Sequence, residues 1–134
     1  SAEMMGGARE LLEQTVRYLN EREQFGVKIG TFQALQHRCA QACCQLELAE
    51  SAVLGALAAA DQGSHNLDEV VSRAKAMAAD VFEHLSNEAV QMHGGMGVTD
   101  EMNVGLFLKR ARVCNQLFGD AHWHRDRFAR LRGF

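Results

Sequence analysis

The sequence predicts an all-α fold, an up-and-down four-helix bundle with a short extra helix at the C-terminus. Proline is absent, and 47% of the 134 residues are hydrophobic, many of them alanine or leucine, which favours helices throughout. Apolar residues recur at helical spacing, and no stretch alternates apolar and polar residues as a strand would. The length suits a single domain, residues 1–134, with a substantial core.

The first half of the chain predicts two helices separated by a loop. Residues 2–21 carry apolar side chains every three or four positions, the pattern of one buried helix face. Gly6 and Gly7 weaken the start of this helix or permit the close approach of a neighbour. Residues 22–31 contain two glycines and are predicted to form a loop. Over residues 32–60 the apolar positions alternate steps of three and four for four heptads, which indicates a bundle seam.

The second half predicts three more helices. Gly63 is suited to the position just after the end of the preceding helix. A second long helical pattern covers residues 66–92 and leads into a glycine-rich turn. A fourth helix is expected from about residue 100 to residue 115, with two acids in its first turn where they suit the helix dipole. A last short helix is predicted over residues 120–131.

The net charge of −3 hides an asymmetry along the chain. Residues 109–134 hold seven Lys or Arg against two acids, a local charge of +5, so the first 108 residues carry −8. Apolar residues interrupt the basic stretch, which therefore indicates amphipathic helices with basic outer faces. No apolar run looks long enough to span a membrane. We expect neither nucleic acid nor membrane as a partner.

No metal site is predicted, because the candidate ligands have the wrong spacing. The four cysteines are Cys39, Cys43, Cys44 and Cys114. This spacing matches no zinc motif, so we expect buried, reduced thiols in an intracellular protein. His122 and His124 lie two positions apart on a helix, where side chains face away from each other, and both are expected at the surface.

Two short stretches could bind an anion. Arg22 stands beside an aromatic residue and a glycine, and a guanidinium group matches phosphate oxygens bidentately. Residues 91–97 hold three glycines between two helices, where freed backbone N–H groups tolerate negative charge. Together the stretches suit a cofactor with a pyrophosphate. The alternative for residues 91–97 is an ordinary helix–helix turn, in which His93 packs rather than binds.

The same stretches resemble a known family. Residues 22–26 read Arg-Glu-Gln-Phe-Gly, residues 29–37 continue Ile-Gly-x-Phe-Gln-x-x-Gln-His, and residues 89–97 read Ala-Val-Gln-Met-His-Gly-Gly-Met-Gly. Both motifs are similar to signatures of the acyl-CoA dehydrogenases. Residues 107–112 resemble the Arg-Asp-Ala stretch that follows them in that family. The match covers nearly the whole chain in the right order.

This resemblance implies the C-terminal helical domain of an acyl-CoA dehydrogenase. The family's N-terminal helical and middle β-domains are missing from residues 1–134, so the sequence looks like a piece of a longer protein. The implied cofactor is FAD. The implied reaction oxidises the Cα–Cβ bond of an acyl-CoA thioester to the 2-enoyl-CoA and passes electrons to an electron-transfer flavoprotein. A homodimer or homotetramer is expected, with a hetero-oligomer as an alternative. The expected location is the cytoplasm of a bacterium or the mitochondrial matrix of a eukaryote.

The resemblance also implies which residues bind the cofactor. They are Arg22, Phe25, Gln33, Gln91, Gly94 and Gly95. Arg22 is expected to contact the FAD pyrophosphate of the neighbouring subunit, with Phe25 beside the adenosine part and Gln33 hydrogen-bonded to the same cofactor. Gln91 and the two glycines are expected to hold the adenosine diphosphate portion from the other side of the subunit interface.

The expected catalytic base is absent from its usual place. Phe118 occupies the position of the glutamate in the family's Tyr-Glu-Gly stretch, and phenylalanine cannot remove a proton. Asp120 is the nearest carboxylate, but a helix N-cap is its preferred interpretation. Glu3 is a weaker candidate. In some branches the base lies on the first helix, at a position upstream of Ser1. The alternatives to a dehydrogenase are a non-catalytic subunit that completes a partner's FAD site and a divergent flavin oxidase.

Overall fold

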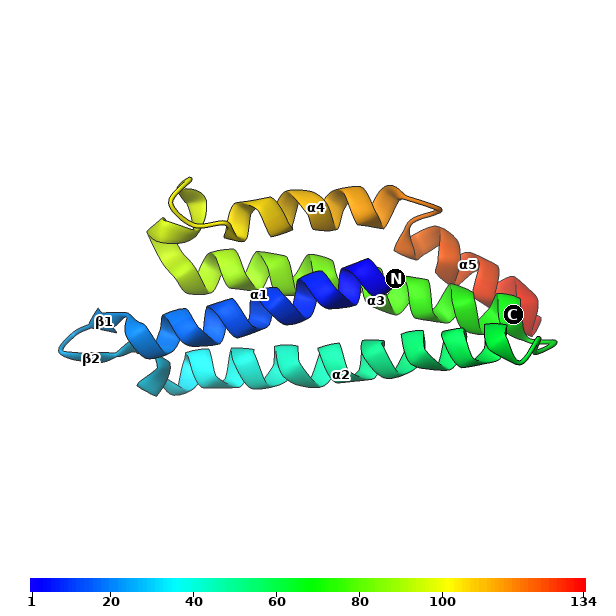
Figure 1. Ribbon diagram of the computed structural model, residues 1–134, viewed down its shortest axis with the longest axis horizontal. Coiled ribbons are helices and arrows are strands. Elements are labelled where there is room, and N and C mark those ends of the chain that lie inside the picture. Colours follow the sequence, from blue (N-terminus) through cyan, green and yellow to red (C-terminus); the bar gives the residue numbers. More distant parts are fainter.

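The computed structural model describes all residues 1–134 and confirms the predicted all-α bundle (Figure 1). The helices are α1 (Ala2–Glu21), α2 (Gln33–Asp61), α3 (Leu67–His93), α4 (Val104–Gln116) and α5 (Ala121–Arg132). Two short strands, β1 (Glu23–Gln24) and β2 (Val27–Lys28), form an antiparallel hairpin after α1, and two 3-10 helices are η1 (Ile29–Thr31) and η2 (Gly94–Val98). The short fifth helix continues the bundle beyond α4, as the sequence predicted.

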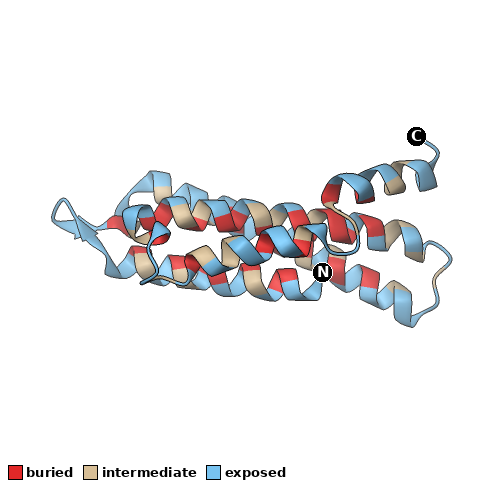
Figure 2. Ribbon diagram, turned by 90° about the horizontal axis from the view of Figure 1, so that it is seen from above, coloured by how far each residue is buried: buried red, intermediate tan, exposed pale blue.

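Helix α3 lies at the centre of the bundle and packs against α1, α2, α4 and α5. Its residues are therefore buried on several faces. Figure 2 shows buried residues in red along the length of the bundle. Phe82 and Leu85 are the largest apolar side chains that α3 buries fully. The small residues around them let neighbouring helices approach closely, and they are Ser72, Ala74, Ala76, Ala78, Ala79, Ser86 and Ala89.

The predicted boundaries of α1, α2, α3 and α5 agree with the structure within about two residues, the usual uncertainty at helix ends. The predicted start of the fourth helix is wrong. Residues 94–98 continue beyond α3 as η2, and the Thr99 backbone N–H donates to the carbonyl of Met96 at 3.2 Å. Asp100 and Glu101 thus lie in the turn before α4 and not in its first turn.

The hairpin is a structure that the sequence did not predict. Phe25 and Gly26 form its two-residue loop with φ values of 55° and 78°. Two left-handed residues give the turn whose twist suits a two-residue hairpin. Each strand has only two residues, too few for an alternating pattern to be visible in the sequence.

Helix α2 buries only a narrow stripe of its surface. The five residues of this stripe are Ala42, Leu46, Ala49, Val53 and Ala56. Leu48 and Leu54, on other faces, are 64% and 66% exposed. By length and composition alone α2 is apolar enough to cross a membrane, contrary to the expectation from sequence. Its Glu47 and Glu50 nevertheless bind Arg9 of α1, as suits a helix within a bundle.

Two expectations about individual side chains are wrong. All four cysteines are free, but Cys43 and Cys44 are exposed because they lie outside the narrow buried stripe of α2. His122 is exposed as expected, whereas His124 is buried, since α5 turns this face toward the α4–α5 connection. The imidazole N–H at Nε2 of His124 donates to the carbonyl of Phe118 at 2.9 Å.

The glycine pair in α1 provides a test of the packing against α3. A Cβ on Gly7 would lie 2.7 Å from Cζ of the buried Phe82, whereas a Cβ on Gly6 meets no atom within 4 Å. We predict that Gly7→Ala lowers the free energy of unfolding by about 1–3 kcal/mol through overpacking. Gly6→Ala, the matched control, should raise it by about 0.5–1 kcal/mol. Urea denaturation measures both, and equal effects would contradict this packing.

Candidate functional site

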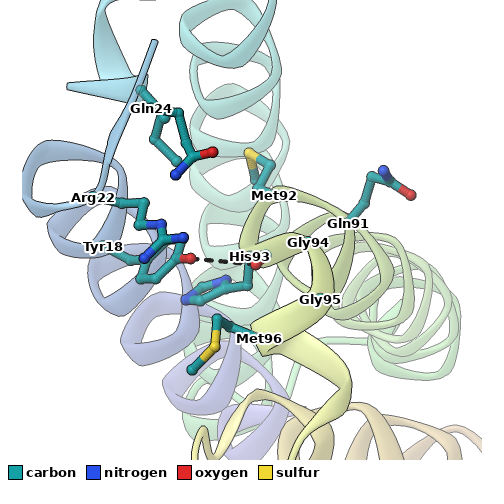
Figure 3. A pocket seen from close by; sticks show the side chains of 10 residues that line it. Tyr18, Arg22, Gln24, Gln91, Met92, His93, Gly94, Gly95 and Met96 are labelled. Carbon is teal, nitrogen blue, oxygen red and sulfur yellow. Dashed lines mark hydrogen bonds between the residues drawn. The ribbon is translucent and has the colours of Figure 1, made fainter. Parts of the chain in front are cut away.

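A cavity of about 400 Å³ lies where the hairpin end of α1 meets the turn after α3 (Figure 3). It is formed by two segments far apart in the sequence, residues 18–29 and residues 91–96. Its lining residues are Tyr18, Arg22, Gln24, Ile29, Gln91, Met92, His93, Gly94, Gly95 and Met96. The two stretches that the sequence singled out thus meet at one place.

Arg22 is held by its backbone at the end of α1. Its N–H donates to the carbonyl of Tyr18 at 2.8 Å, and its own carbonyl accepts from the N–H of Ile29 at 2.9 Å. The guanidinium group is exposed and forms no ion pair, whereas the nearby Arg17 and Lys28 bind carboxylates. Arg22 therefore presents an uncompensated positive charge at the cavity.

The glycine turn forms the opposite wall of the cavity. Gly94 has φ 58° and ψ −138°, a conformation that only glycine adopts readily. A Cβ on Gly94 or Gly95 would meet no atom within 4 Å, so both leave the main chain open to a ligand. Gly97 has a different role, because its Cβ would lie 2.6 Å from the carbonyl oxygen of Val90. That glycine lets η2 pack against α3.

Tyr18 and His93 join the two walls. Their rings stack with centroids 4.3 Å apart, and the Tyr18 hydroxyl donates to the carbonyl of His93 at 3.3 Å. The Nδ1–H of His93 donates to the carbonyl of Ala89 at 2.8 Å, which leaves Nε2 buried without a partner. Burial lowers the pKa of His93, although the bond to Ala89 opposes the shift. His93 both packs on Tyr18 and lines the cavity. Tyr18 was missed because nothing in the spacing links residues 75 positions apart.

The structure does not bring all six expected cofactor residues together. Phe25 lies at the hairpin tip, 92% exposed, with its ring 6.2 Å from that of Phe32. Gln33 is exposed at the start of α2 and does not line the cavity. The side chain of Gln91 points away from Arg22 (Figure 3). Gln24, which sequence reasoning did not select, lines the cavity from the hairpin.

From the sequence, Arg22 and the glycine turn are expected on opposite sides of a subunit interface. Arg22 and the Gln91–Gly95 segment line one cavity of a single chain, because α1 and α3 are neighbours in the bundle. The two segments therefore face the same cavity, and their binding of FAD across a subunit interface stays a prediction.

The residues considered as bases lie elsewhere. Phe118 is 90% exposed in the α4–α5 turn. Asp120 caps α5, since its carboxylate accepts a hydrogen bond from the Trp123 N–H at 2.7 Å. Glu3 binds Arg110 at 2.6 Å, and that guanidinium lowers the pKa of Glu3. Both carboxylates thus have structural partners.

The cavity suits the diphosphate portion of a nucleotide cofactor. A free guanidinium group faces a turn with accessible main chain, and both are groups that hold phosphate oxygens. Its volume lies at the lower end of the range of roughly 300–1,000 Å³ for ligand sites, so it would enclose only part of a dinucleotide. Fold and site define a helical bundle with an anion-compatible cavity at one end.

Comparison with known proteins identifies the family. Residues 1–131 match the family described as acyl-CoA dehydrogenase, C-terminal domain. Acyl-CoA dehydrogenase FadE34 of Mycobacterium tuberculosis is 38% identical over 127 residues, which cover 93% of this chain and 18% of that protein. The chain belongs to the acyl-CoA dehydrogenase family.

Solved structures agree with this assignment. A chain in the structure of the electron transferring flavoprotein of Acidaminococcus fermentans superposes with a TM-score of 0.94 and 31% identity, over 98% of this chain and 34% of that one. The FAD complex of PigA gives a TM-score of 0.91 and 25% identity, over 97% and 34%. This chain thus spans about a third or less of the proteins it matches.

The buried histidine of the site predicts a pH-dependent stability. Because the folded state lowers the pKa of His93 below 6.5, the unfolded chain takes up a proton first as the pH falls. The free energy of unfolding should therefore fall below pH 6.5, by up to about 1.4 kcal/mol per pH unit. His93→Gln should remove the contribution of His93 to the pH dependence of the free energy of unfolding, measured by urea denaturation between pH 7.5 and 5.5. The share of His124, whose pKa burial also lowers, should remain.

The control variant is His122→Gln, which replaces an exposed histidine that does not line the cavity. A slope in His93→Gln equal to that of the unmodified protein would contradict the assignment.

Proposed function

We propose that this domain forms the diphosphate-binding side of the FAD site in an acyl-CoA dehydrogenase. The observation that carries the proposal is the unpaired Arg22 facing the open glycine turn across one cavity. Nearby cationic side chains are neutralised by carboxylates, so this charge is kept for a ligand. The family membership supports a flavin as that ligand.

Each residue of the cavity has a physical role in this proposal. Arg22 binds two phosphate oxygens through its planar guanidinium group. Gly94 and Gly95 let the diphosphate approach the main chain, and the Tyr18–His93 stack fixes the distance between the walls. Phe25 lies outside the cavity at the hairpin tip, where its exposed ring would pack on the adenosine part beyond the diphosphate.

The proposed reaction needs a proton acceptor that residue 118 cannot supply. When bound, FAD supplies the acceptor for the hydride that leaves Cβ while a base removes the proton from Cα, and the electrons then pass to an electron-transfer flavoprotein. Asp120 and Glu3 are engaged in a helix cap and an ion pair. We therefore propose that the base is a carboxylate outside residues 1–134. The product of the proposed reaction is a 2-enoyl-CoA.

The outer face of α2 supports self-association. Leu48, Leu54 and Leu57 are 64%, 66% and 53% exposed on a helix of high hydropathy, which is unusual for a surface that meets only water. We propose that a second copy of the chain covers this face in a homodimer or homotetramer. Light scattering of the full-length protein measures this association, and the mass of a monomer would contradict it.

One observation favours a second function. Phe118 stands where the family's glutamate is expected, and no free carboxylate lies on the α4–α5 turn. A chain of this kind would keep the FAD-facing cavity and complete the site of a partner in a hetero-oligomer, without oxidising a thioester itself.

The proposed FAD site predicts how the FAD affinity of the full-length protein that contains this domain responds to substitution of Arg22. Arg22→Ala should weaken FAD binding about 10- to 100-fold, because it removes a charge-assisted contact of about 1.5–3 kcal/mol. Arg17→Ala removes a similar side chain that lies earlier on α1 and pairs with Glu10, and it should have little effect. Fluorescence titration of the apoprotein with FAD measures both. Equal affinities for the two variants would reject the proposed site.

The second prediction separates the two functions. Under anaerobic conditions a panel of acyl-CoA thioesters should bleach the flavin absorbance of the dehydrogenase, whereas the partner-completing subunit should resist every thioester. Asp120→Asn keeps an N-capping side chain and removes the carboxylate. The Asp120→Asn variant should bleach at an unchanged rate. A loss of bleaching in this variant would identify Asp120 as the catalytic base.

A further inference from the structure

Helix α5 buries fewer residues than any other helix of the bundle. It packs against α3 at one end of the molecule (Figure 1) and buries only His124 and Ala121, of which Ala121 belongs to the main apolar core. Its other links to α3 include three ion pairs, each with one side chain more than half exposed, and such pairs contribute little. They join Arg125 to Asp80, Arg127 to Asp68 and Arg132 to Glu69. The docking of α5 on α3 therefore depends strongly on His124.

The imidazole ring of His124 holds the turn that leads into α5. The ring is buried, and its Nε2–H donates to the carbonyl of Phe118 at 2.9 Å. Since this bond places the proton on Nε2, the Nδ1 atom of the neutral ring carries a lone pair. Nδ1 is buried without a hydrogen-bond partner. A second proton on the ring would therefore form an N–H group that has no acceptor while α5 is docked.

The charges around His124 also oppose its protonation. Lys75 of α3 is buried without a carboxylate partner, and its Nζ donates to two backbone carbonyls of α4 at 3.0 and 3.3 Å. Arg127 is a second cation, on α5 itself, and Asp120 in the turn supplies a negative charge while it caps the helix. Burial lowers the pKa of His124, and the two cations lower it further, whereas the bond to the turn carbonyl and Asp120 act in the opposite direction.

Protonation of His124 is therefore coupled to the position of α5. In the docked helix the second proton meets a buried site without an acceptor, whereas in a released helix the imidazolium is hydrated. The released form thus takes up the proton first as the pH falls, so docking is favoured above pH 6.5 and weakens below it. Because so few buried residues hold α5, its release is a local opening that costs less than unfolding of the bundle.

We propose that His124 is a pH-sensitive switch whose protonation releases α5 from α3 while α1 to α4 stay folded. Release breaks the hydrogen bond to the Phe118 carbonyl and uncovers the part of α3 on which α5 packs. The switch goes beyond the proposed function and does not depend on it, because it involves no ligand.

The test measures amide hydrogen exchange of the full-length protein by mass spectrometry at pH 7.5 and 5.5, corrected for intrinsic exchange rates. Peptides from residues 121–132 report on α5, and peptides from α1 to α4 report on the rest of the bundle. His124→Gln keeps a side-chain N–H for the Phe118 carbonyl but does not titrate. The control variant is His122→Gln, which replaces an exposed histidine of the same helix. Circular dichroism at pH 7.5 confirms that each variant is folded.

We expect the protection of α5 to fall about tenfold at pH 5.5, because one pH unit below 6.5 shifts a proton-linked equilibrium by that factor. The other helices should keep their protection, and in His124→Gln the protection of α5 should not change with pH. Equal protection of α5 at both pH values in the unmodified protein overturns the inference.

Three further outcomes also overturn the inference. They are an equal fall in all five helices, a fall of the same size in His124→Gln, and the loss of the fall in His122→Gln. If His124→Gln does not fold, the comparison of α5 with the other helices in the unmodified protein decides between local release and unfolding of the bundle. None of these outcomes bears on FAD binding, so the proposed function is tested separately.

Discussion

The close packing of α3 against its neighbours is the constraint on which the other features depend. Small residues on several faces of α3 allow α1, α2, α4 and α5 to surround it, and Gly7 of α1 fits over the ring of Phe82. In a close-packed interior, the position of one helix constrains the positions of the helices that pack against it. The end of α1 is therefore fixed relative to the end of α3, and Arg22 is placed opposite the glycine turn.

Two surface features are built on this scaffold in a similar way. At the hairpin, Phe25 and Gly26 form a left-handed pair beside the cavity, and at the α4–α5 turn Phe118 and Gly119 form another. Both rings are exposed. The pairing of β1 with β2 flanks the first pair, and His124 of α5 donates a hydrogen bond to the carbonyl of Phe118 in the second. Strain of this kind persists where the surrounding structure determines it, and it gathers at functional positions.

Helical periodicity was sufficient to predict the helices, because each one buries a stripe with the expected spacing. It failed between η2 and α4, where residues 99–103 form turns and α4 begins only at Val104. The hairpin was too short to leave a pattern. The residues of the cavity were found in part through motifs, but the Tyr18–His93 stack and the inward position of Gln24 depend on tertiary packing. The exposure of Cys43 and Cys44 likewise follows from how little of α2 is covered.

The Tyr18–His93 contact has a consequence for the energetics of the whole domain. It joins residues 75 positions apart, so the cavity exists only when α1 has docked on the end of α3. A ligand that binds there has no matching site in the unfolded chain. By mass action, ligand binding raises the free energy of unfolding of the entire bundle. This stabilisation increases as the ligand concentration rises above the dissociation constant. Occupancy of one end of the molecule is in this way coupled to the persistence of the complete fold.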